Sequence, residues 1–198
     1  GVLKYGRRLT FIGFIAPITS QIDKILLNHF WGPAQLATYS LATTIPGRAT
    51  SLIKDWIDIS FPKLAARTTK EINQVFWKRI FHGLLFGLFL TLVYMVVAPY
   101  LFKYLLPKYL DGLFYSQLLA ISFIFALPNR YISLLLTAQK LSRSILGNSL
   151  VQNTTQIALY VVLGIWGGIL GLVLAKVLFS FISLITNITV WNLSTRKS

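Results

Sequence analysis

Eight ionisable side chains lie inside stretches of sequence that are otherwise apolar. The bases are Lys24, Arg48, Lys54, Arg130 and Lys176, and the acids are Asp23, Asp55 and Asp58. A charge at the centre of an apolar helix that crosses a bilayer costs about 2.5 to 3.5 kcal/mol, unless it faces a partner or a water-filled cavity. Three acids cannot neutralise five bases, so these positions predict a polar cavity with an excess of positive charge. Such a cavity suits an anionic ligand, and the planar guanidinium of Arg48 is well shaped to bind two phosphate oxygens at once.

Uncharged polar residues recur with helical spacing in the same stretches. At about 100° per residue, residues 34–60 place one stripe on an arc of about 120°. This stripe contains Ser40, Thr44, Gly47, Arg48, Ser51, Lys54, Asp55 and Asp58. Two further faces are formed by Asn148, Gln152 and Thr155, and by Lys176, Ser180, Ser183 and Asn187.

These faces predict a shared cavity with two kinds of residue. We expect its ligand-binding part to contain Arg48, Lys24, Arg130, Lys176, Gln152, Asn148 and Ser180. We expect gating or ion coupling to involve Asp23, Lys54, Asp55 and Asp58. In the alternative interpretation, the same groups only hold helices together through hydrogen bonds and the ion pairs Asp23–Arg48 and Lys54–Asp58. Pro46 removes a backbone hydrogen bond in the middle of its helix and predicts a kink there.

The composition is typical of a membrane protein. Hydrophobic residues make up 55% of the 198 residues and charged residues only 12%, compared with about 25% in a soluble domain. A net charge of +14 would suggest nucleic acid as the partner of a soluble protein, but here we expect membrane lipids and no nucleic acid. Cysteine is absent, which excludes disulfides. The two histidines are far apart in sequence and read as interfacial anchors, so we expect neither a metal nor a cofactor.

Apolar stretches of about 20 residues, the length needed to cross a bilayer, recur along the chain. We predict an all-α, polytopic membrane protein with one domain, residues 1–198, formed by six transmembrane helices. The predicted spans are 9–30, 34–60, 75–101, 113–137, 144–165 and 167–191, joined by turns such as 31–33, 106–112 and 139–144.

The basic residues between these spans predict their orientation, because Lys and Arg accumulate in cytoplasmic loops. With a cytoplasmic start, twelve basic residues fall on that side and only Lys103 and Lys108 on the other. The twelve are Lys4, Arg7, Arg8, Lys63, Arg67, Lys70, Lys78, Arg79, Lys140, Arg143, Arg196 and Lys197. We therefore expect a multi-pass protein of the cell (plasma) membrane with both ends of this segment in the cytoplasm.

Several short motifs lie between residues 21 and 65. They are Asp-Lys followed by Leu-Leu at 23–27, Gly32-Pro33, the run Ala-Thr-Tyr-Ser-Leu-Ala at 37–42, and Phe-Pro-Lys-Leu at 61–64. In combination, this segment resembles the polysaccharide transporters of the multidrug/oligosaccharidyl-lipid/polysaccharide flippase superfamily, particularly the O-antigen and lipid-linked oligosaccharide flippases. The resemblance covers about the first third of the chain.

The resemblance implies a MATE-like transporter of two six-helix lobes that face each other across a central cavity. By alternating access it would flip a polyprenyl-diphosphate-linked oligosaccharide across the cytoplasmic membrane, as a part of polysaccharide biosynthesis. This chain would be one lobe, the C-terminal one, of a longer protein, and its partners would be the N-terminal lobe and the anionic glycan lipid. A cation-coupled multidrug exporter and a noncatalytic membrane subunit are the alternatives. We expect no enzyme, because the loops offer only Glu71 and Asp111 as carboxylates.

Overall fold

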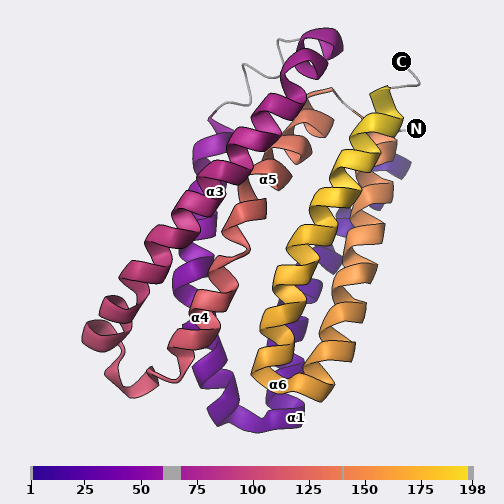
Figure 1. The fold of residues 1–198 in the computed structure, drawn as a ribbon. Coiled ribbons are helices and arrows are strands. Elements are labelled where there is room, and N and C mark those ends of the chain that lie inside the picture. Colours follow the sequence, from indigo (N-terminus) through magenta and orange to yellow (C-terminus); the bar gives the residue numbers. More distant parts are fainter. Residues whose placement is uncertain (1, 60–67, 140, 196–198) are drawn as a thin grey trace.

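The chain is all-helical throughout the part that the structure describes. The computed structural model describes residues 2–59, 68–139 and 141–195. Its elements are α1 (Val2–Asp58), α3 (Thr69–Leu105), the short 3₁₀ helix η1 (Pro107–Tyr109), α4 (Gly112–Ala120), α5 (Phe123–Ala138) and α6 (Ser142–Thr195). Figure 1 shows these helices as long rods packed side by side, with α3 against α4 and α5. The predicted all-α class is confirmed.

Two glycines fold α1 and α6 into hairpins. Gly32 has φ 84° and Gly168 has φ 55°, both in the left-handed region that favours glycine. Each glycine divides its helix into two arms. In Figure 1 the arms of α6 run side by side, whereas those of α1 diverge from their turn, the first behind α6 and the second behind α4. The hydroxyls of Ser144 and Ser194, near opposite ends of α6, lie 2.8 Å apart. Both reversals coincide with turns that the sequence predicts between apolar stretches.

The two hairpin turns pack against each other at one end of the bundle. The indole Nε1 of Trp31 donates to the carbonyl oxygen of Gly164 at 3.3 Å. A Cβ atom at Gly168 would lie 3.1 Å from the Trp31 ring, so this glycine also allows the close approach. Trp31 therefore joins the turn of α1 to the turn of α6; we call this contact the Trp31 clasp.

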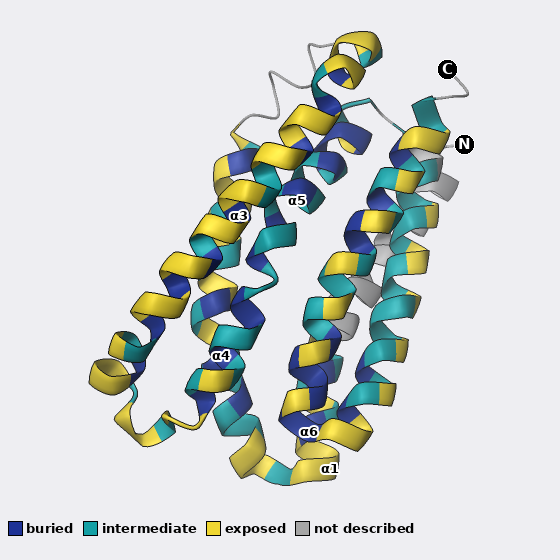
Figure 2. Cartoon of the chain, in the orientation of Figure 1, coloured by how far each residue is buried: buried dark blue, intermediate teal, exposed yellow. Residues whose placement is uncertain are grey.

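Helix α3 has clear start and stop signals. Thr68 and Glu71 form a capping box, in which each side chain accepts from the backbone N–H of the other. The helix ends just before Pro107, which disfavours helical dihedrals in the residue that precedes it. Figure 2 shows a buried stripe on the side facing α4 and α5, and exposed residues elsewhere. At Gly87 a Cβ atom would lie 2.5 Å from the carbonyl oxygen of Phe123, so the small residue allows α3 and α5 to approach closely here.

Helices α4 and α5 form a broken rod with a bend of 44° between them. The hydroxyl of Ser122, at the break, donates to the carbonyl oxygen of Leu119 at 2.7 Å. Pro128 lies inside α5 and lacks the N–H that a continuous helix would use. The first turns of α5 lie beside the second arms of α1 and α6, where Phe123 packs near Ala49 and Asn129 contacts Ser180.

Length and composition identify two helices in the described part of the chain that could cross a membrane. They are Thr69–Leu105 and Ser144–Thr195, and α4 with α5 makes a third if the bent pair is one span. Apolar helices compatible with membrane insertion are thus present. The predicted count of six is not reached by this criterion, in which both arms of α6 count as one helix and α1 does not qualify within the described residues. The motif at 61–64 and the basic residues 63, 67, 140, 196 and 197 lie outside the described residues.

Candidate functional site

A polar cleft lies between the second arm of α1, the α4–α5 break and both arms of α6. It has two adjoining parts, which share Thr50, Lys54, Ser122, Phe179 and Ser180. The first, here the amide pocket, has about 300 Å³ and is otherwise lined by Ala126, Asn129, Arg130, Ser133, Asn148, Gln152, Ser183 and Asn187. The second, here the tyrosine pocket, has about 510 Å³ and is otherwise lined by Thr43, Pro46, Gly47, Ser51, Leu119, Gln156, Tyr160 and Lys176.

Apolar packing holds the cleft walls on two sides. One cluster includes Phe76 of α3, Ile132 of α5 and Trp191 of α6, in which the rings of Phe76 and Trp191 stack at 5.8 Å between centroids. The other joins Leu27 of α1 to Leu172 of α6. The two clusters lie toward opposite ends of the second arm of α6. They therefore hold the helices together on either side of the polar cleft.

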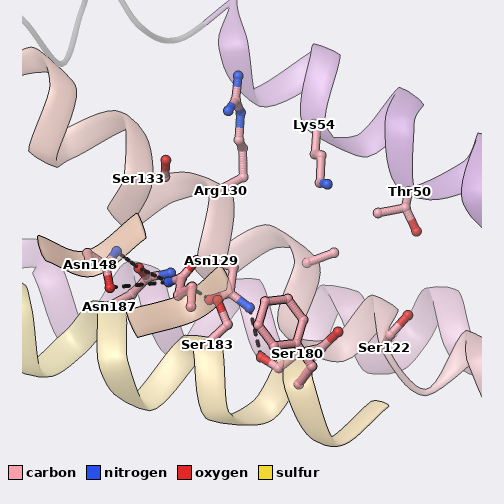
Figure 3. Close-up of a pocket in the computed structure, with 13 residues that line it drawn as sticks. Thr50, Lys54, Ser122, Asn129, Arg130, Ser133, Asn148, Ser180, Ser183 and Asn187 are labelled. Carbon is pink, nitrogen blue, oxygen red and sulfur yellow. Dashed lines mark hydrogen bonds between the residues drawn. The ribbon is translucent and has the colours of Figure 1, made fainter. Parts of the chain in front are cut away.

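Four amide side chains connect α5 to both arms of α6. Asn187 Oδ1 accepts from Asn148 Nδ2 at 2.7 Å and from Gln152 Nε2 at 2.9 Å. Asn187 Nδ2 donates to Asn129 Oδ1 at 2.8 Å, and Asn129 Nδ2 donates to the carbonyl oxygen of Ser180 at 2.9 Å. Figure 3 shows Asn148, Asn187 and Asn129 gathered at one end of the amide pocket. These bonds satisfy amides that would otherwise be costly between apolar helices.

Three hydroxyl groups of the cleft already donate their hydrogens to backbone carbonyls close by in the chain. Thr50 and Ser180 each donate to the carbonyl oxygen four residues earlier, at 2.9 Å. Ser122 donates to the carbonyl oxygen three residues earlier, as described above. Each of these oxygens keeps a lone pair but has no second hydrogen to give. Toward a ligand, this part of the cleft is therefore an acceptor surface.

Arg130 of α5 binds Asp58 at the end of α1. Its Nε donates to Asp58 Oδ1 at 2.6 Å, and its Nη2 pairs with Oδ2. This two-bond geometry matches the fork of the guanidinium to the carboxylate. The pair fixes the second arm of α1 to α5 and neutralises one of the two basic groups of the amide pocket.

Asp23, Tyr39 and Lys176 form a buried cluster at the tyrosine pocket. Asp23 is 1% exposed, and its Oδ2 lies 2.7 Å from Lys176 Nζ and accepts from the Tyr39 hydroxyl at 2.6 Å. The Lys176 ammonium also lies 5.0 Å from the centroid of the Tyr39 ring. The cluster joins both arms of α1 to α6 and neutralises the Lys176 charge.

Lys54 differs from these two bases. Within residues 2–59, 68–139 and 141–195 it forms no ion pair, although it lines both pockets. Figure 3 shows its side chain directed from α1 toward the opposite wall of the amide pocket. The cleft therefore combines one uncompensated cation with hydroxyl acceptors and amides.

Five of the seven predicted ligand-binding residues line this cleft: Arg130, Lys176, Gln152, Asn148 and Ser180. Lys24 and Arg48 line neither pocket, and the side chains of Arg48 and Asp55 are exposed. The predicted stripe on α1 is too wide for all of it to face one cleft. Arg48 and Lys54 are six residues apart, so at about 100° per residue they point about 120° apart. The cleft lies on the Lys54 edge of the stripe.

Both predicted ion pairs are wrong. Asp23 pairs with Lys176 rather than Arg48, and Asp58 pairs with Arg130 rather than Lys54. In each case a base on another helix has replaced a candidate on α1 itself. The predicted kink at Pro46 is also not found as a break, because the only non-helical dihedrals within α1 are those of Gly32.

The sequence interpretation missed Thr50 and Tyr160, which line the cleft, and Tyr39 of the buried cluster beside it. A usable signal existed for Tyr39, because a hairpin at Gly32 brings residues on either side of it together in pairs. Asp23 and Tyr39 lie at nearly equal distances from that glycine, and their side chains meet. No comparable signal in the sequence connects Tyr160 to α1.

No group of three or more His, Cys, Asp or Glu side chains that could hold a metal ion occurs within the described part of the chain. Comparisons of this chain with protein-family models, with curated proteins and with solved structures find no match.

Proposed function

We propose that this chain is one lobe of a membrane transporter that flips a polyprenyl-diphosphate-linked oligosaccharide, as the resemblance of residues 21–65 implies. The arms of α1 and α6, with α3 and the α4–α5 rod, are then six spans of a multi-pass protein of the plasma membrane. The distribution of basic residues supports an orientation with both ends in the cytoplasm. A second lobe, facing the cleft, completes the transport cavity.

The observation that carries this proposal is the unpaired Lys54 in a cleft lined by amides and hydroxyl acceptors. The Lys54 side chain is exposed in this lobe. Once a second lobe and the bilayer enclose the cleft, a cation without a partner there would be costly, so its retention indicates a use for the charge. The lysine ammonium would bind a phosphate oxygen of the diphosphate. The hydroxyl oxygens of Thr50, Ser122 and Ser180 would accept from sugar hydroxyls, which donate hydrogen bonds.

The test is a flipping assay on the full-length protein in proteoliposomes. Loss of a hydrogen bond to a charged group weakens binding by about 1.5 to 3 kcal/mol, so Lys54→Gln should reduce flipping at limiting substrate about 10- to 100-fold. Lys54→Arg should retain most of the activity. The matched control, Lys70→Gln, removes an exposed lysine at the start of α3 and should flip normally. Normal flipping by correctly inserted Lys54→Gln would refute the role of Lys54.

A cation-coupled exporter of small organic molecules is the second candidate, and the buried Asp23 favours it. Binding of a coupling cation to this carboxylate would release Lys176 into the tyrosine pocket, which would couple transport to an ion gradient. Transport that follows an ion gradient and is independent of glycan-lipid supply would select this candidate. Absence of any transport by the full-length protein would instead favour a noncatalytic membrane subunit.

A further inference from the structure

A basic groove lies on the outer face of α3, apart from the residues that line the polar cleft. It is lined by Val75, Lys78, Arg79 and His82, and has a volume of about 410 Å³. Among the described residues, neither Lys78 nor Arg79 forms an ion pair. None of the four residues lines the polar cleft. The groove therefore holds positive charge that the proposed transport cavity does not use.

An apolar crevice adjoins this groove and shares Arg79 with it. The crevice has about 130 Å³ and is lined by Ile57, Arg79, Gly83, Leu127, Pro128 and Tyr131. The Arg79 guanidinium carbon lies 5.6 Å from the centroid of the Tyr131 ring, within cation–π range. This contact holds the charge at the junction, so one continuous site has a basic end and an apolar end.

The position of the groove along α3 corresponds to the surface of a bilayer. Residues 83–102, directly after the groove, contain no charged residue, and 20 helical residues span about 30 Å, the thickness of the hydrocarbon core. Lys78, Arg79 and His82 therefore lie at the level of the lipid headgroups. Trp77 and Phe81 beside them are each 60% exposed, as expected of aromatic anchors at a membrane interface.

We propose that this site binds one anionic phospholipid. Lys78 and Arg79 hold the headgroup phosphate, and the first part of an acyl chain enters the crevice that Ile57, Leu127 and Tyr131 line. The second acyl chain of the lipid lies along exposed apolar side chains on the flank of α3 below Lys78, such as Leu85 and Phe89. The charge of the groove selects an anionic lipid over a zwitterionic one, and the crevice selects a lipid over a soluble phosphate.

The experiment is native mass spectrometry of the full-length protein exchanged into equal amounts of phosphatidylglycerol and phosphatidylcholine. Wild type should retain one phosphatidylglycerol in preference. Lys78→Gln/Arg79→Gln removes two basic residues, each of which contributes to the free energy of binding an anionic headgroup. This double variant should retain the lipid about 30-fold less strongly than wild type. The matched control Lys103→Gln/Lys108→Gln removes two exposed lysines, one from the last turn of α3 and one from η1, and should retain the lipid. The exchange Lys78→Arg/Arg79→Lys should also retain it.

Three outcomes would overturn the proposal. They are equal retention by wild type and Lys78→Gln/Arg79→Gln, equal loss in both charge-removing double variants, and displacement of the lipid by millimolar inorganic phosphate. If Lys78→Gln/Arg79→Gln does not insert, a fluorescence measurement on wild type replaces it. The Trp77 signal is the part of the fluorescence that is lost in Trp77→Phe. Brominated phosphatidylglycerol should quench this signal more strongly than brominated phosphatidylcholine, and equal quenching by the two lipids would overturn the proposal. The proposal needs only that α3 spans the bilayer, so it stands or fails separately from the transport function.

Discussion

The buried pair of Asp23 and Lys176 predicts an unequal cost for removing its two partners. In Lys176→Met, the carboxylate of Asp23 would remain 1% exposed with only the Tyr39 hydroxyl as a side-chain partner. An uncompensated buried charge costs about 3 to 5 kcal/mol. In Asp23→Asn, the Tyr39 hydroxyl can still donate to the amide oxygen, and the Lys176 side chain, 27% exposed, can take up water from the tyrosine pocket. This change should cost only about 1 to 2 kcal/mol.

The double variant makes the reasoning quantitative. Asp23→Asn/Lys176→Met contains no buried charge at this position, so it should be more stable than Lys176→Met alone. The coupling free energy of the cycle should be about 3 kcal/mol. The free energy of unfolding in mixed detergent micelles, measured at equilibrium for the four proteins, gives this value. The control Asp55→Asn removes an exposed carboxylate and should change stability by less than about 0.5 kcal/mol. Additive single changes, or equal costs for the two single variants, would refute the assignment of Asp23 as the buried member of the pair.

Three other predictions concern the amides and the glycines, and the same unfolding measurement checks them. Asn187→Leu should cost about 1 to 3 kcal/mol, because it removes the shared partner of three amides. Gly168→Ala should cost about 1 to 3 kcal/mol because of its positive φ, whereas Gly167→Ala, with open space around it, should cost less than about 0.5 kcal/mol. Gly87→Ala should cost about 1 to 3 kcal/mol through overpacking against the start of α5, and a neutral effect comparable to that of Gly147→Ala would contradict the close approach.

The places where the chain turns could be predicted from the sequence because the signals are local. Gly32 stands before a proline and between apolar stretches, and Gly168 lies in a run of small residues; both turns occur there. The amide faces were predicted for a similar reason. Asn148 and Gln152 are one helical turn apart, so they must point the same way wherever the helix lies.

The partners of the charges could not be predicted, because they depend on how separate helices are arranged. Helical spacing makes Lys54 and Asp58 neighbours on α1, but the position of α5 gives Asp58 a bidentate partner in Arg130. The same spacing places Arg48 within the polar stripe without saying which edge of the stripe the cleft uses. Which base remains available to a ligand thus depends on the distances between helices, and the periodicity of one helix does not reveal these distances.

The Trp31 clasp has a mechanical consequence for any widening of the cleft. The indole bond to Gly164 and the contact with Gly168 make the turns of α1 and α6 move together at their end of the bundle. A rigid-body rotation of α1 away from α6 would then pivot at this clasp. Atomic displacements would increase along each arm, and within the second arm they would be greatest at its end, Asp58. The pair of Asp58 with Arg130 restrains the second arm where its displacement is greatest, so breaking this pair would release the widest movement of that arm.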